Sequence, residues 1–492
     1  MASLPSQEAP PAKDVLAPIR PTDTGLVSGL DGNVLRFLGI PYAAPPVGLL
    51  RWRPPLPAQP WPGVRQATQF APDCFCHPLL RKGSRATGMS EDCLYLNIWC
   101  PPETNTPRPV LVWIYGGGFI GGSSALPFYD GTALARMGVV VVSFNYRANV
   151  FGFFAHPELS RETQGQTSGN YGLLDMLAAL EWVKRNISSF GGDPSRVTVF
   201  GESAGASSLG LLLTSPMSAG LFSGAILQSP GLMRPLATLA ESEAAGEQLG
   251  DLVQLRNMNA ADLMLRAGPG MSMSRDLMSP RQTGPIQDGW LLPLSDADAM
   301  AGGHFARIPI IIGSNADEGR FFVKHLPVNT VPEYRKYLST QFGGAAAATE
   351  ERYPVTSDND VKAALSQLFG DNQFNHGVDA FSDTFVRWNV PVWRYRFNGN
   401  VGGDKLPATH GEEIPYVFGA FENDALEILP SMRDEVMGAD LALSRHMATA
   451  WTTFAERGNP NCEDILPWEE YGKDGAIAVF GSTGTEGSIP LK

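Results

Sequence analysis

A serine between two glycines lies where a strand-like segment meets a helix-like one. Residues 197–200 are β-branched or aromatic, residues 201–205 read Gly-Glu-Ser-Ala-Gly, and small residues follow. This spacing is typical of a sharp strand-to-helix turn that exposes the serine, because a side chain at either glycine would clash. The start of the following helix favours the negative charge that develops when a serine attacks a carbonyl. The pattern predicts Ser203 as a nucleophile; an ordinary glycine-rich turn is the alternative.

Three consecutive glycines at residues 116–118 follow another strand-like run. Glycine lets backbone N–H groups approach a carbonyl oxygen closely. We predict that the N–H groups of Gly117, Gly118 and Ala204 form an oxyanion hole. A phosphate-binding loop is the alternative, but it would require Lys followed by Ser or Thr after the glycines, and neither follows.

A serine nucleophile needs a general base, which must come from the seven histidines. In this class of fold the nucleophile, the acid and the histidine follow one another in that order. This order leaves His304, His325, His376, His410 and His446. His410 is preferred, because it lies in a loop after the strand-like residues 392–397, where catalytic side chains are commonly carried. Asp317 and Glu318, after the strand-like residues 308–312, both remain candidates for the acid.

The elements that must position these residues are apolar runs alternating with helical patterns. Strands are expected at residues 110–115, 139–144, 196–200, 224–227, 308–312 and 392–397, and helices at 172–187 and 449–456. Continuous apolar strands separated by helices indicate an α/β sheet, mostly parallel and covered on both faces. We predict a flexible proline-rich arm over residues 1–24 and one domain over 25–492, since no linker or repeat is evident after it.

The composition excludes several classes of function. The chain has 492 residues, 43% of them hydrophobic, and a formal net charge of −13. Such an acidic chain is a poor candidate for nucleic-acid binding, and no run approaches the ~20 apolar residues of a membrane span. The five cysteines lack zinc-ligand spacing, and the proposed chemistry needs no metal or cofactor. We expect a monomer or homodimer that is secreted or periplasmic, its signal peptide having been removed, with the cytoplasm as the alternative.

Further segments make the chain resemble the type-B carboxylesterases, the family that also holds the cholinesterases. They lie at residues 37–43, 91–99, 143–147, 169–175, 190–194, 317–319 and 416–419, besides the serine turn. The resemblance implies an α/β-hydrolase fold with long insertions, and ester hydrolysis through an acyl-enzyme. It identifies Glu318 as the acid and supports His410 as the base. It also implies a Cys74–Cys93 disulfide and two structural ion pairs, Arg51–Glu91 and Arg147–Asp175.

The substrate is less constrained than the reaction. The loop between Cys74 and Cys93 contains no Trp, so choline esters are poor candidates. Two stretches are rich in Lys and Arg and could attract an anionic ester, although a solvated surface is the alternative. They contain Arg81, Lys82 and Arg85, and Arg266, Arg275 and Arg281. We assign substrate binding to Tyr115, Phe119, Glu202, Arg320, Phe321 and Phe322.

We therefore predict a serine carboxylic-ester hydrolase that acts on a small-molecule ester. If the two basic stretches contact the substrate, this ester bears carboxylates. One alternative is a detoxifying esterase that removes tricarballylate side chains from fumonisin-type mycotoxins. An amidase or lactone hydrolase would use the same three residues. A non-catalytic adhesion protein on the same fold is the alternative from another class, although such proteins typically lose the catalytic residues.

Overall fold

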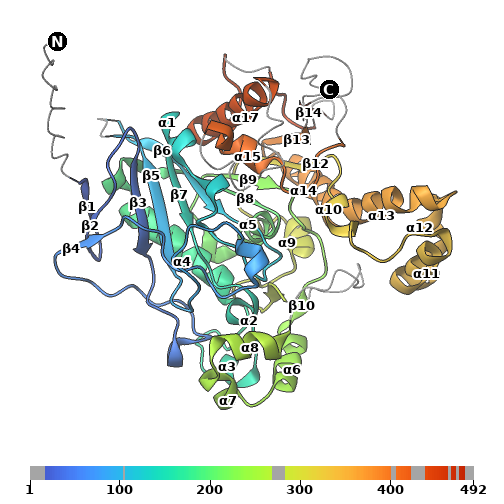
Figure 1. The fold of residues 1–492 in the computed structure, drawn as a ribbon, viewed down its shortest axis with the longest axis horizontal. Helices are drawn as coiled ribbons and strands as arrows, with labels where there is room; N and C mark the ends of the chain where they lie inside the picture. Colours follow the sequence, from blue (N-terminus) through green and yellow to red (C-terminus); the bar gives the residue numbers. More distant parts are fainter. Residues whose placement is uncertain are drawn as a thin grey trace, which may run out of the picture.

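A nine-stranded sheet forms the centre of the molecule (Figure 1). The computed structural model describes residues 17–102, 106–268, 283–399, 406–422, 438–463, 467–472 and 476–481. The strands, in their order across the sheet, are β14 (Ile477–Gly481), β13 (Val392–Gly399), β12 (Ile310–Asn315), β9 (Gly224–Gln228), β8 (Gly192–Glu202), β6 (Arg108–Ile114), β7 (Val140–Phe144), β5 (Tyr95–Cys100) and β3 (Leu35–Pro41). Every strand expected from the sequence lies in this sheet.

The sheet is parallel from β14 to β7, and at the other edge β5 pairs antiparallel with both β7 and β3. Its central strands are buried along nearly their whole length, as a sheet covered on both faces requires. Helix α5 (Ala204–Thr214) packs on β8 and β9, while α17 (Gly438–Arg457) packs on β6 and β8. The helix expected near residues 172–187 is α4 (Tyr171–Asn186). The predicted α/β fold is therefore confirmed.

Order begins earlier than the sequence indicated. Residues 1–16 of the expected arm lie outside the described residues. Residues 19–22, which we expected in the same arm, instead form β1 (Ile19–Thr22), which pairs antiparallel with β2 (Gly25–Ser28). A third short strand, β4 (Val64–Gln66), completes this small sheet. The boundary at residue 25 was wrong, because ladder hydrogen bonds from β2 hold a segment whose own sequence is rich in turn-forming residues.

A helical lobe follows β12 and has a hydrophobic core of its own. It comprises α10 (Arg320–Val323), α11 (Val331–Phe342), α12 (Ala346–Arg352) and α13 (Val361–Gly370). Its buried centre includes Tyr334, Leu338 and Leu365 and is separate from the main core. Figure 1 shows these helices projecting from one end of the sheet. A π-helical turn, η8 (Asp371–Asn375), joins α13 to α14 (His376–Arg387), which packs on β12 and β13.

The scaffold contacts implied by the resemblance are partly present. Arg147 binds Asp175 at 2.7 Å and Arg51 binds Glu91 at 2.5 Å, so both expected ion pairs are confirmed. The expected disulfide is not present, because Cys74 and Cys93 are both free thiols. Their side chains hydrogen-bond to each other, and this contact together with burial raises the pKa of Cys93.

No helix within the described ranges is long and apolar enough to span a bilayer.

Candidate active site

Ser203 occupies a strained turn between β8 and α5. Its backbone has φ 54° and ψ −121°, a region that non-glycine residues rarely adopt. The flanking glycines are required by close approach: a Cβ on Gly205 would lie 2.0 Å from the Ile114 carbonyl oxygen, and one on Gly201 would lie 2.8 Å from the carbonyl carbon of Gly205. Ser203 is therefore held at the end of β8, directly before the first turn of α5.

The glycine-rich loop after β6 packs directly against this turn. A Cβ on Gly116 would lie 2.9 Å from the Cβ of Ser203, so the two backbones touch. Gly117 and Gly118, which come next, have φ of +124° and +63°. These conformations suit glycine, and they turn the loop sharply beside the serine. The structure thus brings the predicted donors Gly117, Gly118 and Ala204 into the neighbourhood of Ser203.

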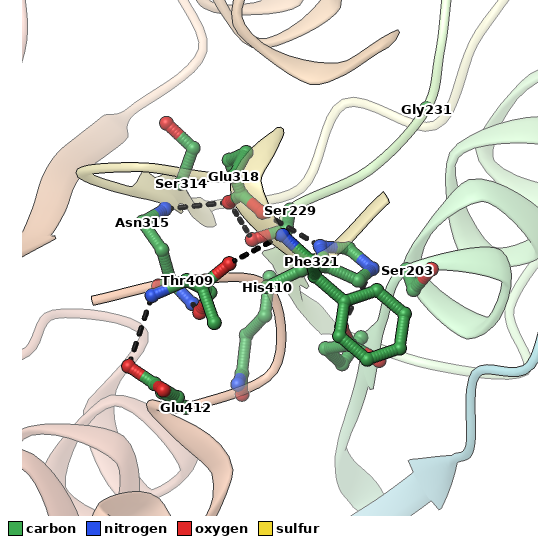
Figure 2. A network of polar contacts seen from close by, with 12 residues as sticks. Ser203, Ser229, Gly231, Ser314, Asn315, Glu318, Phe321, Thr409, His410 and Glu412 are labelled. Carbon is green, nitrogen blue, oxygen red and sulfur yellow. Dashed lines mark hydrogen bonds and ion pairs between the residues drawn. The ribbon is translucent and has the colours of Figure 1, made fainter. Parts of the chain in front are cut away.

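His410 lies between two carboxylates. Its Nδ1 is 2.6 Å from Oε2 of Glu318, and its Nε2 is 3.1 Å from Oε1 of Glu202. Figure 2 shows the imidazole between Glu318 and Ser203, with the second ring nitrogen on the serine side. Within the described residues this nitrogen makes no hydrogen bond. The three residues predicted from the sequence, one from each of three distant segments, therefore converge.

The other oxygen of Glu318 is held by two further donors. The hydroxyl of Ser229, at the end of β9, donates to Oε1 at 2.5 Å, and the backbone N–H of Asn315 donates at 2.6 Å (Figure 2). The carboxylate is buried, so these bonds replace the water that a charged group requires. Together with His410, they define the orientation of the Glu318 side chain.

The loop that carries His410 is tied to the loop that carries Glu318. The side chain of Asn315 donates to the carbonyl oxygen of Thr409 at 2.8 Å and to Oε2 of Glu413 at 2.6 Å. In return, the backbone N–H of Phe321 donates to the Thr409 hydroxyl at 3.0 Å. Because Thr409 directly precedes His410, these bonds fix the position of the backbone from which the imidazole side chain extends.

The buried carboxylates and the imidazole shift one another's protonation. Burial raises the pKa of Glu202 to about 8; His410 opposes this shift, and Glu413 and Glu318 add to it. Burial by itself lowers the pKa of His410, but Glu202 and Glu318 raise it by more, to about 9. Burial and the charge of Glu318 likewise raise the pKa of Glu413. The site therefore stabilises an imidazolium ion once one forms.

Aromatic rings surround the histidine. The ring centroids of Phe322 and Phe374 lie 5.0 and 4.5 Å from that of His410, and the Phe321 centroid lies 6.3 Å away. Phe321 is 59% exposed, so it presents an apolar surface beside the histidine. Phe374 is buried. Phe321 and Phe322 thus lie where a bound ester could contact them.

Two residues assigned to substrate binding lie in the core instead. Tyr115 has no exposed surface and stacks on Tyr146 with centroids 4.5 Å apart. Phe119 is 1% exposed and packs edge-on against Phe153. Both side chains are buried in aromatic pairs, so neither offers a surface to a ligand. Their closeness to the glycines in sequence was misleading.

Most of the basic residues considered at the sequence level have local partners. Arg81 binds Asp73 at 2.7 Å, and Arg85 binds Asp130 at 3.2 Å. Arg266 donates to the carbonyl oxygen of Leu249, and Lys82 is exposed. Arg275 and Arg281 lie outside the described residues. Arg320, on the first turn after Glu318, binds Asp317 at 3.1 Å and the Pro407 carbonyl oxygen.

The sequence analysis missed Ser229, Asn315, Glu413 and Phe374. None of the four belongs to a motif that the sequence analysis used to assign a role. One further cation, Arg234, was also missed; it donates to Gln373 in the π-helical turn. Within the described part of the chain, no group of His, Cys, Asp and Glu side chains is arranged to hold a metal ion.

Comparison with known proteins agrees with this geometry. The model of the carboxylesterase family matches residues 17–485. The fumonisin B1 esterase of Sphingopyxis macrogoltabida is 55% identical over 466 residues, covering 94% of this chain and 86% of that protein. The para-nitrobenzyl esterase of Bacillus subtilis is 35% identical over 92% of each chain.

Solved structures give the same result. A thermophilic PNB esterase superposes with a TM-score of 0.82 at 34% identity, covering 94% of this chain and 96% of that one. A second PNB esterase structure gives a TM-score of 0.81, also at 34% identity, with 94% and 95% covered. The fold, the serine turn and these relatives agree, and the chain belongs to the carboxylesterase family of α/β-hydrolases and is a carboxylic-ester hydrolase.

Proposed function

We propose that Ser203, His410 and Glu318 form the catalytic triad of this hydrolase. His410 takes the proton of the Ser203 hydroxyl on Nε2 while the serine oxygen attacks the ester carbonyl carbon. The same nitrogen then returns the proton to the leaving alcohol, and an acyl-serine remains. A water molecule, deprotonated by His410, attacks the acyl group, and the acid leaves as Ser203 regains its proton.

Glu318 holds the imidazole and stabilises its charged form during both steps. The 2.6 Å contact with Nδ1 supports this role, because it places the proton-free nitrogen on the serine side. The N–H groups of Gly117, Gly118 and Ala204 would bind the oxyanion. Support comes from the contact of Gly116 with Ser203 and from the position of Ala204 in the first turn of α5.

For the substrate, we propose an ester that bears carboxylates, of the fumonisin B1 type. The observation that carries this proposal is the 55% identity to a fumonisin B1 esterase over 94% of the chain, against 35% to the acetylcholinesterase of Bungarus fasciatus. We propose that Arg320 and Arg234 bind the carboxylates of this ester. Support comes from their positions: Arg320 lies two residues after Glu318, and Arg234 donates to Gln373, the neighbour of Phe374. The exposed ring of Phe321 would contact an alkyl chain.

The test uses fumonisin B1 and a neutral ester, p-nitrophenyl acetate, with wild type and Ser203→Ala across a salt series. We expect wild type to release the carboxylated side chains, with kcat/KM falling as salt rises, and Ser203→Ala to lose at least ~10³-fold on both esters. An organophosphate should label Ser203 stoichiometrically.

Each part of the proposal has a contrary outcome. Unchanged activity of Ser203→Ala would remove the triad assignment. Hydrolysis of the neutral ester alone would agree with the proposed triad but contradict the proposed carboxylate-bearing substrate. An amide analogue of the neutral ester, tested in parallel, would reveal an amidase.

We also propose export to the periplasm or medium and a monomeric or homodimeric state. Cell fractionation and light scattering on the purified chain test these two points. Activity confined to the cytoplasm, or a larger assembly, would contradict them.

A further inference from the structure

The turn η8 is a π-helix, a rare form that often occurs at functional sites. Its two ends are anchored to different parts of the molecule. Asp371 accepts a 2.9 Å hydrogen bond from the hydroxyl of Tyr353 in the helical lobe. Asn375 accepts a 2.8 Å hydrogen bond from Ser314, near the end of β12. The π-helical turn is therefore held between the lobe and the sheet.

The helix before this turn packs directly on the catalytic acid. A Cβ on Gly370 would lie 3.4 Å from the Cβ of Glu318 and 3.4 Å from the backbone nitrogen of Gly319. A Cβ on Gly319 would lie 1.9 Å from the carbonyl oxygen of Ser366 in α13. The backbone of α13 thus sets the position of the Glu318 segment, and the π-helical turn begins at that contact.

Within this turn, Phe374 is directed at the imidazole. Its ring centroid lies 4.5 Å from that of His410, closer than any other aromatic ring that the described residues place near this histidine. The two planes are inclined by 31°, so the phenyl face covers part of the imidazole. The ring centroid of Phe322 lies 5.7 Å from that of Phe374, so both phenyl rings belong to one cluster with the imidazole. Phe374 is only 5% exposed, so its ring is surrounded by protein atoms and not by solvent.

The extra residue of a π turn is what allows this contact. An α-helix advances about 100° per residue, so inserting one residue turns the side chains after it to another face. Here the two side chains at the centre of the turn go to different sites. Gln373 accepts a hydrogen bond from Arg234 in the loop after β9, whereas the ring of Phe374 packs against the imidazole of His410.

We propose that Phe374 is a positioning residue for ester hydrolysis and that η8 exists to direct it. The ring confines the imidazole to the orientation in which Nδ1 meets Glu318 and Nε2 is on the serine side. It also favours the imidazolium through its π face. This inference rests on the triad proposed above. A purely structural role for Phe374 as core packing is the competing interpretation.

The experiment compares Phe374→Leu and Phe374→Tyr with Phe369→Leu. Leu fills the site without a ring face, and Tyr keeps the ring. Phe369 is the matched control, because it stacks on Phe322 at 4.7 Å, whereas the phenyl rings beside His410 in the described part of the chain are those of Phe321, Phe322 and Phe374. Wild type and Ser203→Ala are assayed beside them with p-nitrophenyl acetate, so that the outcome does not depend on the natural substrate.

We expect Phe374→Leu to lower kcat about tenfold or more with KM within about twofold of wild type, since small displacements of a catalytic group cost rate. Phosphorylation of Ser203 by a neutral organophosphate should slow by a similar factor. The low-field proton resonance of His410 Nδ1–H, assigned by its loss in Glu318→Gln, should shift. Phe374→Tyr should restore most of the rate, and Phe369→Leu should resemble wild type.

Equal kcat and an unshifted resonance in Phe374→Leu and Phe369→Leu would overturn the proposal while Ser203→Ala still supports the triad. If the Phe374 variants do not fold, Ser314→Ala decides, because it releases one end of η8 without touching His410. A folded Ser314→Ala with lowered kcat and a shifted resonance supports the proposal. Unchanged values of both rule it out.

Discussion

The hydroxyl of Ser229 donates a 2.5 Å hydrogen bond to Oε1 of Glu318, the oxygen that does not face His410. The two residues come from the ends of β9 and β12, which are neighbours in the sheet. The acid is thus held by the sheet itself as well as by its own loop, through the N–H of Asn315. The geometry of the proposed triad therefore depends on the register between these two strands.

Ser229→Ala is the direct test of this support. A hydrogen bond to a charged group contributes roughly 1.5–3 kcal/mol, so we expect kcat/KM to fall about tenfold or more. Ser382→Ala is the control, since Ser382 is also buried but its hydroxyl donates only to Val378 within α14. Steady-state kinetics on a neutral ester would measure both. Equal rates for the two variants would show that Asn315 alone orients Glu318.

The carboxylate of Glu202 predicts a pH effect. Glu202 and Glu318 raise the pKa of His410 to about 9 against the lowering effect of burial, and the histidine must be neutral to act as a base. Glu202→Gln removes one negative charge 3.1 Å from Nε2. The pKa of His410 should then fall, and the acidic limb of the pH profile of kcat/KM should move to lower pH. A limb that stays in place would mean that Glu202 does not set the protonation of the base.

Arg147 and Arg185 form a matched pair for stability. Arg147 is 2% exposed in its side chain and binds Asp175, which is fully buried, whereas Arg185 is 48% exposed and binds Asp23. Arg147→Met leaves a buried carboxylate without its partner and should cost about 3–5 kcal/mol of unfolding free energy. Arg185→Met should cost less than about 1 kcal/mol. Urea unfolding would measure the difference, and similar costs would contradict the assignment of Arg147 as scaffold.

Arg320 separates substrate recognition from loop support. If it meets a substrate carboxylate, Arg320→Gln should raise KM for fumonisin B1 about fivefold, as loss of a ~1 kcal/mol contact would, and leave p-nitrophenyl acetate unaffected. Lys324→Gln, one turn along the same exposed segment, is the control. An equal loss on both esters would instead assign Arg320 to holding Asp317 and the Pro407 backbone in place.

The sheet and the strained turn at Ser203 could be predicted from sequence because their signals are local. Strands buried on both faces read as unbroken apolar runs. The two glycines at Ser203 belong to a known short motif, because the turn packs closely against itself and against Ile114 of β6. Strand β1 was missed, since it is four residues long, half-exposed and interrupted by a proline.

The supporting residues of the site could not be found in this way. Ser229 meets Glu318 only because β9 pairs with β12, and Phe374 meets His410 only because a π turn shifts the helix register. Neither relationship leaves a periodic pattern. For Tyr115 and Phe119 the inference was misled in the opposite way: they neighbour the glycines along the chain, but their side chains are buried in aromatic pairs. For the cysteines, the two side chains named by the resemblance lie in contact, but the structure shows no disulfide between them.

The separate core of the helical lobe bears on which substitutions the molecule can accept. Substitutions among its own apolar residues alter the lobe without repacking the sheet, because the two cores share no members. Gly319, where the lobe joins the Glu318 segment, tolerates no side chain, because a Cβ there would collide with the Ser366 carbonyl oxygen. We therefore expect apolar substitutions in the body of the lobe to leave Glu318 in place, and any side chain at residue 319 to displace it. The lobe is a part of the molecule that can be altered without altering the segment that carries this carboxylate.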